Sequence, residues 1–216
     1  MGGTGRGASV TNLQNQRTGG AEAASTRRAE ILAVAAEVFR EKGIVNATVR
    51  DIAQRAGILS GSLYHHFDSK EQMIEEILTS TGEPLLERCR TIIESAVGPS
   101  EALRGCIAAA VGYLAAAPNE AAILRNDARA IASMPRLAFV QGRREVMVDV
   151  WVRLVRDGQR RGVFRKEADP VIAVAAMWDA ILTSTQWIRP DSKGSPKRVA
   201  AQLGDFFVYG LQTRKS

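Results

Sequence analysis

Proline begins one helical pattern after another in this chain, and this repetition constrains the fold more than any other feature. Proline suits the first turn of a helix, because an N–H at that position would have no intrahelical partner. Five of the seven prolines precede long segments with helical apolar spacing: Pro99, Pro118, Pro135, Pro170 and Pro196. Asp169 and Ser195 stand before two of them as N-caps. Alternating β-branched runs with hairpin turns are missing, so the sequence predicts an all-α protein of about nine helices.

The first residues differ in composition from the rest. Residues 1–24 are rich in glycine, without an apolar period or the apolar core of an export signal. The longest apolar run, from Gly105 to Ala117, is well short of the roughly 20 residues of a membrane span. We therefore expect a disordered arm at 1–24, a small domain at 25–72, a larger helical domain at 73–216 and a cytoplasmic location.

Composition narrows the class of function. The net charge of +6 favours a polyanionic partner, most simply nucleic acid. The two cysteines, Cys89 and Cys106, fit no metal spacing and indicate buried thiols in a reducing compartment. Glycine-rich phosphate loops and Ser/His/Asp spacings are missing, so we expect no catalytic residue, metal or cofactor. An all-α enzyme remains a distant alternative, and an architectural DNA protein without an effector is another.

The stretch TVRDIAQRAGILSGSLYHHFDSKEQM, residues 48–73, places two short helical patterns around one glycine. Thr48 with Asp51 is a capping box that begins the first helix. Gly57 stands at the turn, where a positive φ is expected. Two short helices that cross at a glycine turn and pack on a third form a helix-turn-helix. Neighbouring residues on a helix point about 100° apart, so His65 and His66 make a poor pair of metal ligands.

The second helix of this unit presents small and polar side chains outward. Small residues let the helix backbone approach base edges in the major groove, and hydroxyls or a ring nitrogen can read bases or hold phosphates. The residues concerned are Ser60, Gly61, Ser62, Tyr64 and His65. The geometry therefore favours DNA recognition over metal binding.

The segment AAEVFREKGIVNATVRDIAQRAGILSGSLYHHFDSKEQM, residues 35–73, resembles the DNA-binding domain of the TetR family of bacterial transcriptional regulators. The matching positions are Phe39, Gly43, Thr48, Ile52, Ala53, Ala56, Gly57 and Gly61 to Glu71. The resemblance implies that a first group of residues holds phosphates, namely Thr48, Tyr64 and Lys70. It implies that a second group faces bases, namely Ser60, Gly61, Ser62 and His65.

Other basic residues extend this hypothesis. Arg50 is expected to add a phosphate contact, although a solvated charge is an equal alternative. Arg27 and Arg28 are expected to clamp the DNA backbone or reach a minor groove. Leu59 departs from the family pattern because its side chain cannot cap the following helix, so Ser60 is expected to cap it.

The resemblance also implies a helical C-terminal domain that binds an effector and dimerises through its last two helices. Apolar stripes on these helices agree, and they predict a homodimer interface that contains Trp178, Leu203, Phe206 and Phe207. Plain core packing is the alternative for these residues. Asp127, Trp151 and Trp178 are the candidate effector contacts. A solvated edge is the alternative for Asp127, which falls on an apolar stripe and otherwise needs a partner or a ligand.

The same resemblance suggests an effector class. The sequence RDIAQRAGILSGSLYHHF is most similar to TetR-type regulators of steroid or fatty-acid breakdown, which implies a repressor released by a small amphipathic effector such as a CoA thioester. Arg153, Arg156 and Arg160 share a helix face that can hold phosphates, although a solvated face explains them too. The alternative is a multidrug-type regulator that senses uncharged or cationic hydrophobic compounds.

Overall fold

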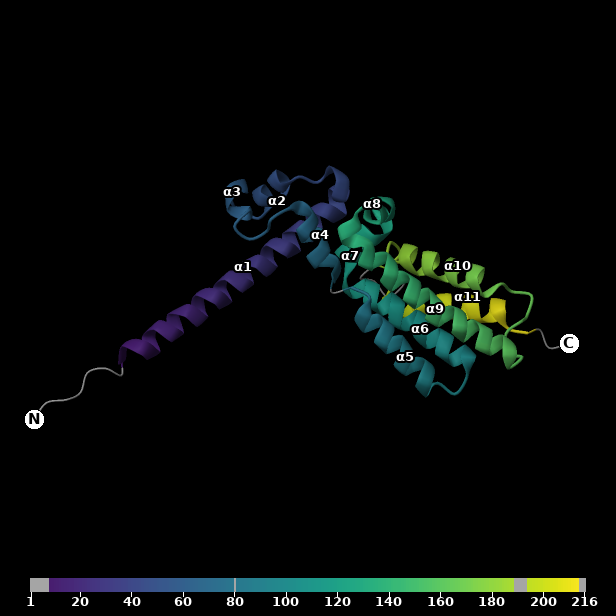
Figure 1. The fold of residues 1–216 in the computed structure, drawn as a ribbon. Helices are drawn as coiled ribbons and strands as arrows, with labels where there is room; N and C mark the ends of the chain where they lie inside the picture. The colour runs from purple at the N-terminus through teal and green to yellow at the C-terminus, as the bar shows by residue number, and fades with distance from the viewer. Residues whose placement is uncertain (1–7, 80, 189–193, 214–216) are drawn as a thin grey trace, which may run out of the picture.

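The computed structural model describes residues 8–79, 81–188 and 194–213, with side chains from residue 25 onward. In these ranges the chain forms eleven α-helices, one 3-10 turn and no strand beyond an isolated bridge between Phe164 and Gln212 (Figure 1). The all-α prediction is confirmed. The elements are α1 (Ala8–Asn46), α2 (Val49–Arg55), α3 (Ser60–Leu63), α4 (Lys70–Thr79), α5 (Glu83–Ser95), α6 (Pro99–Ala116), α7 (Pro118–Asn126), α8 (Ala128–Ser133), η1 (Pro135–Leu137), α9 (Ala138–Arg160), α10 (Pro170–Ser184) and α11 (Pro196–Leu211).

The helix starts follow the sequence signals. Proline opens α6, α7, α10 and α11, and Pro135 opens the 3-10 turn. The Asp169 carboxylate accepts hydrogen bonds from the N–H groups of Val171 (2.7 Å) and Ile172 (3.1 Å), so it caps α10 as predicted. The Ser195 hydroxyl accepts from the Arg198 N–H at 3.4 Å and caps α11.

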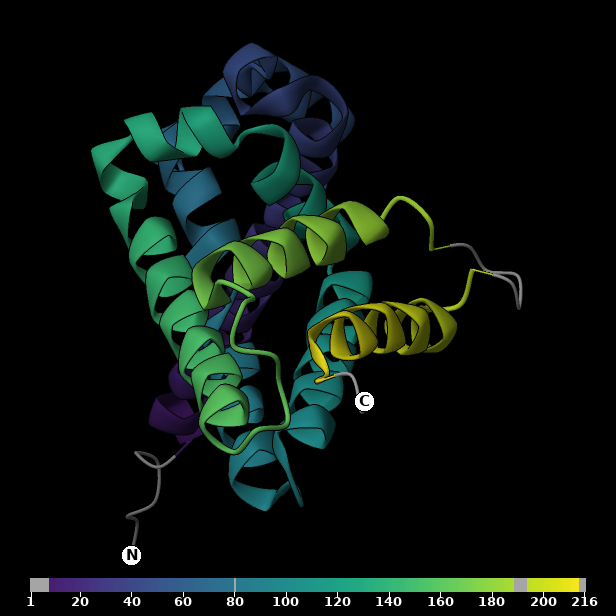
Figure 2. The ribbon, with the colours of Figure 1, turned by 90° about the vertical axis from the view of Figure 1, so that its right-hand side faces the viewer.

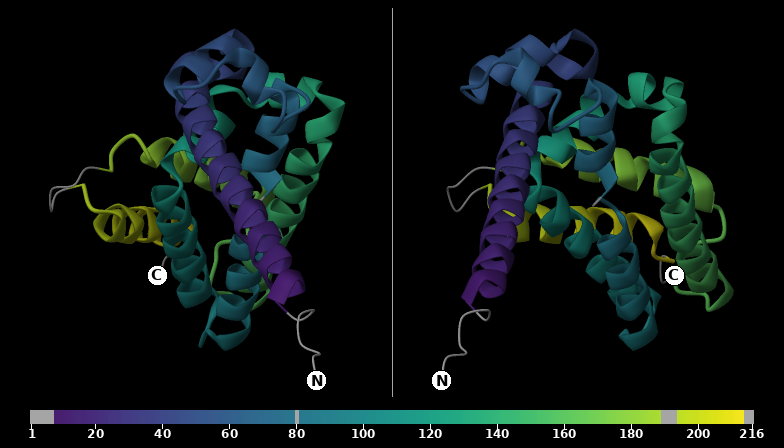
Figure 3. Two further views of the ribbon diagram at one scale, coloured as in Figure 1. Left: turned by 90° about the vertical axis from the view of Figure 1, so that its left-hand side faces the viewer. Right: turned by 60° about the vertical axis from the view of Figure 1, so that its left-hand side comes forward.

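The N-terminal segment departs from its prediction. Residues 8–24 continue α1 as one long helix (Figure 3), so the expectation of a disordered arm is wrong for this part of the chain. Residues 1–7 lie outside the described residues. Once the buried part of α1 is packed, each preceding residue extends an existing helix and needs no new nucleation, and no proline interrupts the segment.

The side chains form two apolar clusters. The first joins α1–α4 and also takes in Ile123, Ile131 and Leu137 from α7, α8 and η1. The second joins α5, α6 and α9–α11 around the fully buried Trp151. Because its buried residues belong to the first cluster, α4 packs with the helix-turn-helix, although residues 73–79 were expected in the larger domain. In Figure 2, α2 and α3 lie at the top, and α10 and α11 face the viewer below them.

None of the described helices alone has the length and apolar composition of a membrane span. Only α6 and α7 taken together meet those criteria, and they are bent against each other by 102°.

Gly158 is the point where the backbone leaves least room. A Cβ atom at this position on α9 would lie 2.1 Å from Cδ2 of Phe164, which is fully buried. We expect Gly158→Ala to lower the free energy of unfolding by about 1–3 kcal/mol, because the ring must move within a packed core. Gly142 lies on the same helix with open space around it, so Gly142→Ala should instead stabilise the protein by about 0.5–1 kcal/mol. Urea denaturation checks both, and equal effects would contradict the steric argument.

Candidate nucleic-acid interface and effector domain

The entry to α2 has the capping geometry that the sequence predicts. The Asp51 N–H donates to the Thr48 hydroxyl at 3.1 Å, and the Thr48 N–H donates to the Asp51 carboxylate at 2.9 Å. The Lys42 ammonium at 2.5 Å and the Thr48 hydroxyl and N–H hold the pKa of Asp51 well below its usual range. This network fixes the orientation of α2, whose own length is only seven residues.

The turn between α2 and α3 confirms one expectation and overturns another. Gly57 has φ +66°, the left-handed conformation expected of it. Leu59 occupies the N-cap of α3 and makes no side-chain hydrogen bond, so the prediction that Ser60 caps this helix is wrong. The short α3 begins at Ser60 with its first N–H groups uncapped by any side chain. Its position instead depends on burial of Leu63 and Phe67.

Most of the predicted DNA contacts lie on an exposed surface. Thr48 and Arg50 are exposed at the start of α2, and Arg50 has no ion pair or hydrogen bond among the described residues. Ser60, Gly61, Tyr64 and His65 are exposed on α3 and the turn after it, whereas Ser62 is half-buried. Phosphate-binding and base-reading candidates therefore share the outer side of one helix-turn-helix, as recognition of a duplex requires.

Lys70 differs from this group. Its ammonium donates to the backbone carbonyls of Ile44 (2.7 Å), Ala47 (2.9 Å) and Val45 (3.4 Å). In this structure the charge closes the segment between Gly43 and α2, and the phosphate contact of Lys70 stays a prediction. Sequence reasoning could place Lys70 at the start of α4 but not see the carbonyl groups opposite it.

Arg27 and Arg28 are also engaged within the protein. Arg27 donates to the Ala56 carbonyl at 3.0 Å. Arg28 donates to the His66 carbonyl at 3.3 Å, lies 4.4 Å from the Phe67 ring centroid and pairs with Glu76. The prediction that both arginines clamp DNA is not supported, since they brace the ends of α2 and α3 against α1.

Two of the three candidate effector contacts meet inside the C-terminal domain. The rings of Trp151 and Trp178 are in contact, with centroids 5.1 Å apart. Both indole N–H groups are buried; that of Trp151 interacts with the Cys89 thiol, whereas that of Trp178 has no hydrogen-bond partner among the described residues. Buried donors are nearly always satisfied, so the Trp178 N–H is unusual. Trp178 contacts Trp151 and is half-buried, and its place in a dimer interface stays a prediction.

Asp127 lies elsewhere, between α7 and α8 and against the end of α1. One carboxylate oxygen accepts a hydrogen bond from the Ile44 N–H at 3.1 Å, and the other is buried without a partner. Burial raises the pKa of Asp127 above its ordinary value, opposed by the Ile44 hydrogen bond. The carboxylate that looked like an effector ligand in the sequence is therefore a contact between the larger domain and the helix-turn-helix.

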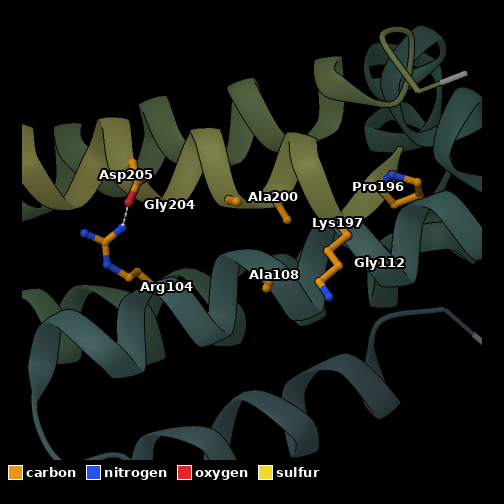
Figure 4. A pocket seen from close by; sticks show the side chains of 9 residues that line it. Arg104, Ala108, Gly112, Pro196, Lys197, Ala200, Gly204 and Asp205 are labelled. Atoms are coloured by element: carbon orange, nitrogen blue, oxygen red, sulfur yellow. Dashed lines mark hydrogen bonds and ion pairs between the residues drawn. The ribbon is translucent and has the colours of Figure 1, made fainter. Parts of the chain in front are cut away.

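Two hollows open on the surface of the larger domain. One is a shallow, wide-open hollow of about 560 Å³ at the end of α9, lined by Arg156, Gln159, Arg160 and Lys166. The other, of about 510 Å³, lies between α6 and α11 (Figure 4). Arg104 and Asp205 form an ion pair at one end of it, and small residues such as Ala108 and Gly204 line it. This hollow was not predicted from the sequence, although the small residues on both helices indicate a place where side chains leave space.

The last two helices expose apolar side chains. Phe206 is 73% exposed, as expected for an interface residue, whereas Leu203 and Phe207 are half-buried. Ile172 on α10 is 70% exposed and Tyr209 on α11 is 65% exposed. Sequence reasoning did not select these two, because an apolar stripe alone does not reveal which edge of it stays uncovered.

An exposed helix-turn-helix joined to a helical domain with its own core defines a DNA-binding transcriptional regulator. The family described as "Bacterial regulatory proteins, tetR family" matches residues 31–77, and "Tetracyclin repressor-like, C-terminal domain" matches residues 96–211. The chain belongs to the TetR family. Members of this family bind operator DNA, dimerise and bind small-molecule effectors.

Individual relatives match across both domains. The HTH-type transcriptional repressor KstR2 of Mycobacterium tuberculosis is 36% identical over 187 residues, covering 87% of this chain and 94% of the relative. The KstR2 repressor of Rhodococcus jostii is 33% identical, covering 87% of this chain and 92% of its own. The solved structure of the ketosteroid transcriptional regulator KstR2 of Mycobacterium tuberculosis has a TM-score of 0.80 at 34% identity, over 87% of this chain and 96% of that one.

The two cations at the helix-turn-helix should behave differently. We expect Arg50→Ala to weaken binding to mixed-sequence duplex DNA and to reduce the slope of log affinity against log salt by about one unit, because a free exposed cation can neutralise one phosphate. Lys70→Met keeps the aliphatic stem but removes the donor to three carbonyls. It should lower the free energy of unfolding by about 1–3 kcal/mol and leave the salt slope unchanged. The reverse pattern would return Lys70 to the phosphate-binding residues.

Proposed function

We propose that this regulator is a cytoplasmic repressor that binds its operator as a homodimer and is released by a CoA thioester of steroid or lipid breakdown. The observation that carries the DNA-binding part is the exposed surface around Thr48, Arg50 and Tyr64. Relatives named as KstR2 repressors, one of them a ketosteroid regulator, support the repressor role and the effector class. The proposal assigns no catalytic residue to the chain.

The basic hollow at the end of α9 supports a phosphate-bearing effector. Arg156 and Lys166 are exposed there without an ion pair among the described residues. Arg160 forms an ion pair with the Asp157 carboxylate, with 3.0 Å between nitrogen and oxygen. Guanidinium and ammonium groups bind phosphate through charge-assisted hydrogen bonds. The nucleotide part of CoA carries several phosphates, so this hollow suits that part of the molecule.

The tryptophan pair supports a polar acyl group. Trp151 lies on α9, the helix that also carries Arg156 and Arg160 at its end. The Trp178 indole N–H lacks an acceptor among the described residues, and an unsatisfied buried donor costs free energy. A carbonyl group on the acyl part would satisfy it. A purely aliphatic chain offers no acceptor beyond the thioester itself.

The effector class can be tested by DNA release. The operator duplex is first selected by the protein from a random library, and is then challenged with steroid-derived and fatty-acyl CoA thioesters, their free acids and free CoA. We expect release by at least one thioester and none by its free acid at the same concentration. Recovery of the intact thioester distinguishes a regulator from an enzyme. Release by uncharged hydrophobic drugs alone would instead place the protein among multidrug-sensing regulators.

The basic hollow provides a matched pair of variants for the same assay. Removing Arg156 and Lys166 together, each to Ala, should raise the concentration of the active thioester needed for release by about tenfold or more. Arg153→Ala is the control, because Arg153 is exposed on α9 but pairs with Asp149 at 3.3 Å and does not line the hollow. Equal responses of both variants would remove the hollow from the proposal.

The exposed apolar residues of α10 and α11 suit a two-fold interface. We expect Phe206→Glu to yield monomers in sedimentation velocity and to weaken operator binding, because a buried, unpaired charge opposes association. The control is Val97→Glu, which adds the same charge at an apolar residue 93% exposed in the turn before α6. A dimer that survives Phe206→Glu at unchanged affinity would show that the interface lies elsewhere.

A further inference from the structure

We infer that α7 connects the end of α10 directly to the helix-turn-helix, with Arg125 and Asp127 as the positioning residues at its two contacts. This inference goes beyond effector identity and does not depend on it. α7 lies between the two parts of the protein (Figure 1) and packs against both α1 and α10. The two positioning residues lie at the end of this short helix, with only Asn126 between them in the chain.

The first contact joins Asp127 to the segment that leads into α2. The Ile44 N–H donates to the Asp127 carboxylate at 3.1 Å. This N–H is free to do so because α1 breaks at Gly43, where φ is +76°. A Cβ at Gly43 would lie 3.1 Å from the same carboxylate oxygen, so the approach is close. Asp127 therefore holds the backbone at the point where α1 ends.

The segment held by Asp127 determines where the DNA-binding helices begin. Only three residues lie between Ile44 and Thr48, the N-cap of α2. On its other side the segment is closed by Lys70, whose ammonium donates to the carbonyl groups of Ile44 and Ala47. A displacement of Asp127 must therefore be taken up by the start of α2 or by breaking the hydrogen bond to Ile44.

The second contact joins Arg125 to the end of α10. The Arg125 guanidinium donates to the Thr185 hydroxyl at 2.7 Å, and that hydroxyl donates to the Leu182 carbonyl at 2.9 Å. Thr185 is the C-cap of α10, the helix that also exposes Ile172. A change in how α10 packs, within the dimer or around the two tryptophans, is thus carried to Arg125 by a side-chain contact.

Asp127 holds the backbone at Ile44 through a single hydrogen bond. Its second carboxylate oxygen is buried and makes no hydrogen bond, so one N–H donor alone compensates for desolvation of the charge. A fully satisfied carboxylate would lock the segment in place, whereas this one can exchange its partner at modest cost. Other contacts also cross between the domains, including Arg143 to the Thr79 carbonyl at 2.6 Å, so an experiment must isolate α7 from them.

The experiment perturbs one end of the connection and measures the other. Amide hydrogen exchange of the Ile44 N–H and the neighbouring segment is followed in the full-length protein, without any added ligand. Thr185→Val removes the hydroxyl that Arg125 binds and should speed exchange at Ile44 by about threefold or more while α6 stays protected. Thr183→Val is the matched control, because Thr183 is exposed on the same helix and contacts neither positioning residue among the described hydrogen bonds. Equal exchange at Ile44 in both variants would overturn the connection.

A second pair of variants tests the first contact. Asp127→Ala removes the acceptor and should speed exchange at Ile44 by about tenfold, whereas Asp127→Asn keeps an acceptor oxygen and should restore much of the protection. If Asp127→Ala also makes Ile44 insensitive to Thr185→Val, the two contacts act in series. An additive response would show that Thr185 reaches the helix-turn-helix by another route, and would overturn the inference. The assay contains no effector, so its failure leaves the proposed function untouched.

Discussion

The arrangement of the whole DNA-binding region depends on the way the Lys70 ammonium closes the segment between α1 and α2. Three carbonyl groups that follow the break of α1 at Gly43 converge on one charge. Without that charge they would need water or another donor, because unpaired carbonyls at the end of a helix are costly when they are shielded from solvent. The position of α2 against α1, and of α3 against both, follows from this closure and from the capping box that Thr48 and Asp51 form at the start of α2.

Local signals in the sequence were sufficient for the fold class and for which side of the helix-turn-helix is exposed. Prolines and caps such as Asp169 act through their immediate neighbours, so the helix starts could be predicted from residues a few positions apart. The conformation of Gly57 followed from the turn that it must make. The exposure of Arg50, Tyr64 and His65 followed from helical periodicity, since buried and exposed faces alternate regularly on short helices.

Long-range contacts account for what could not be predicted. Lys70, Arg27 and Arg28 look like DNA contacts in the sequence, yet each binds a backbone carbonyl that lies far away along the chain. The apolar stripe around Asp127 left two interpretations open, a solvated edge or a carboxylate in need of a partner, and the partner in the structure is a backbone N–H 83 residues earlier. Charge and periodicity show that a group must be satisfied; they do not show by which group, because that depends on the packing of α7 against α1.

The tryptophans also give this protein an optical property. Trp151 and Trp178 are in ring contact inside the larger domain, whereas Trp187 is half exposed beyond the end of α10. Indole emission depends on the polarity around the ring and on quenching by close neighbours. Trp151 is fully buried, Trp178 is partly buried and Trp187 is half exposed, so the three rings emit from different surroundings and a water-soluble quencher reaches Trp187 most readily. Light emitted by the unlabelled protein thus separates events inside the domain from events at its surface.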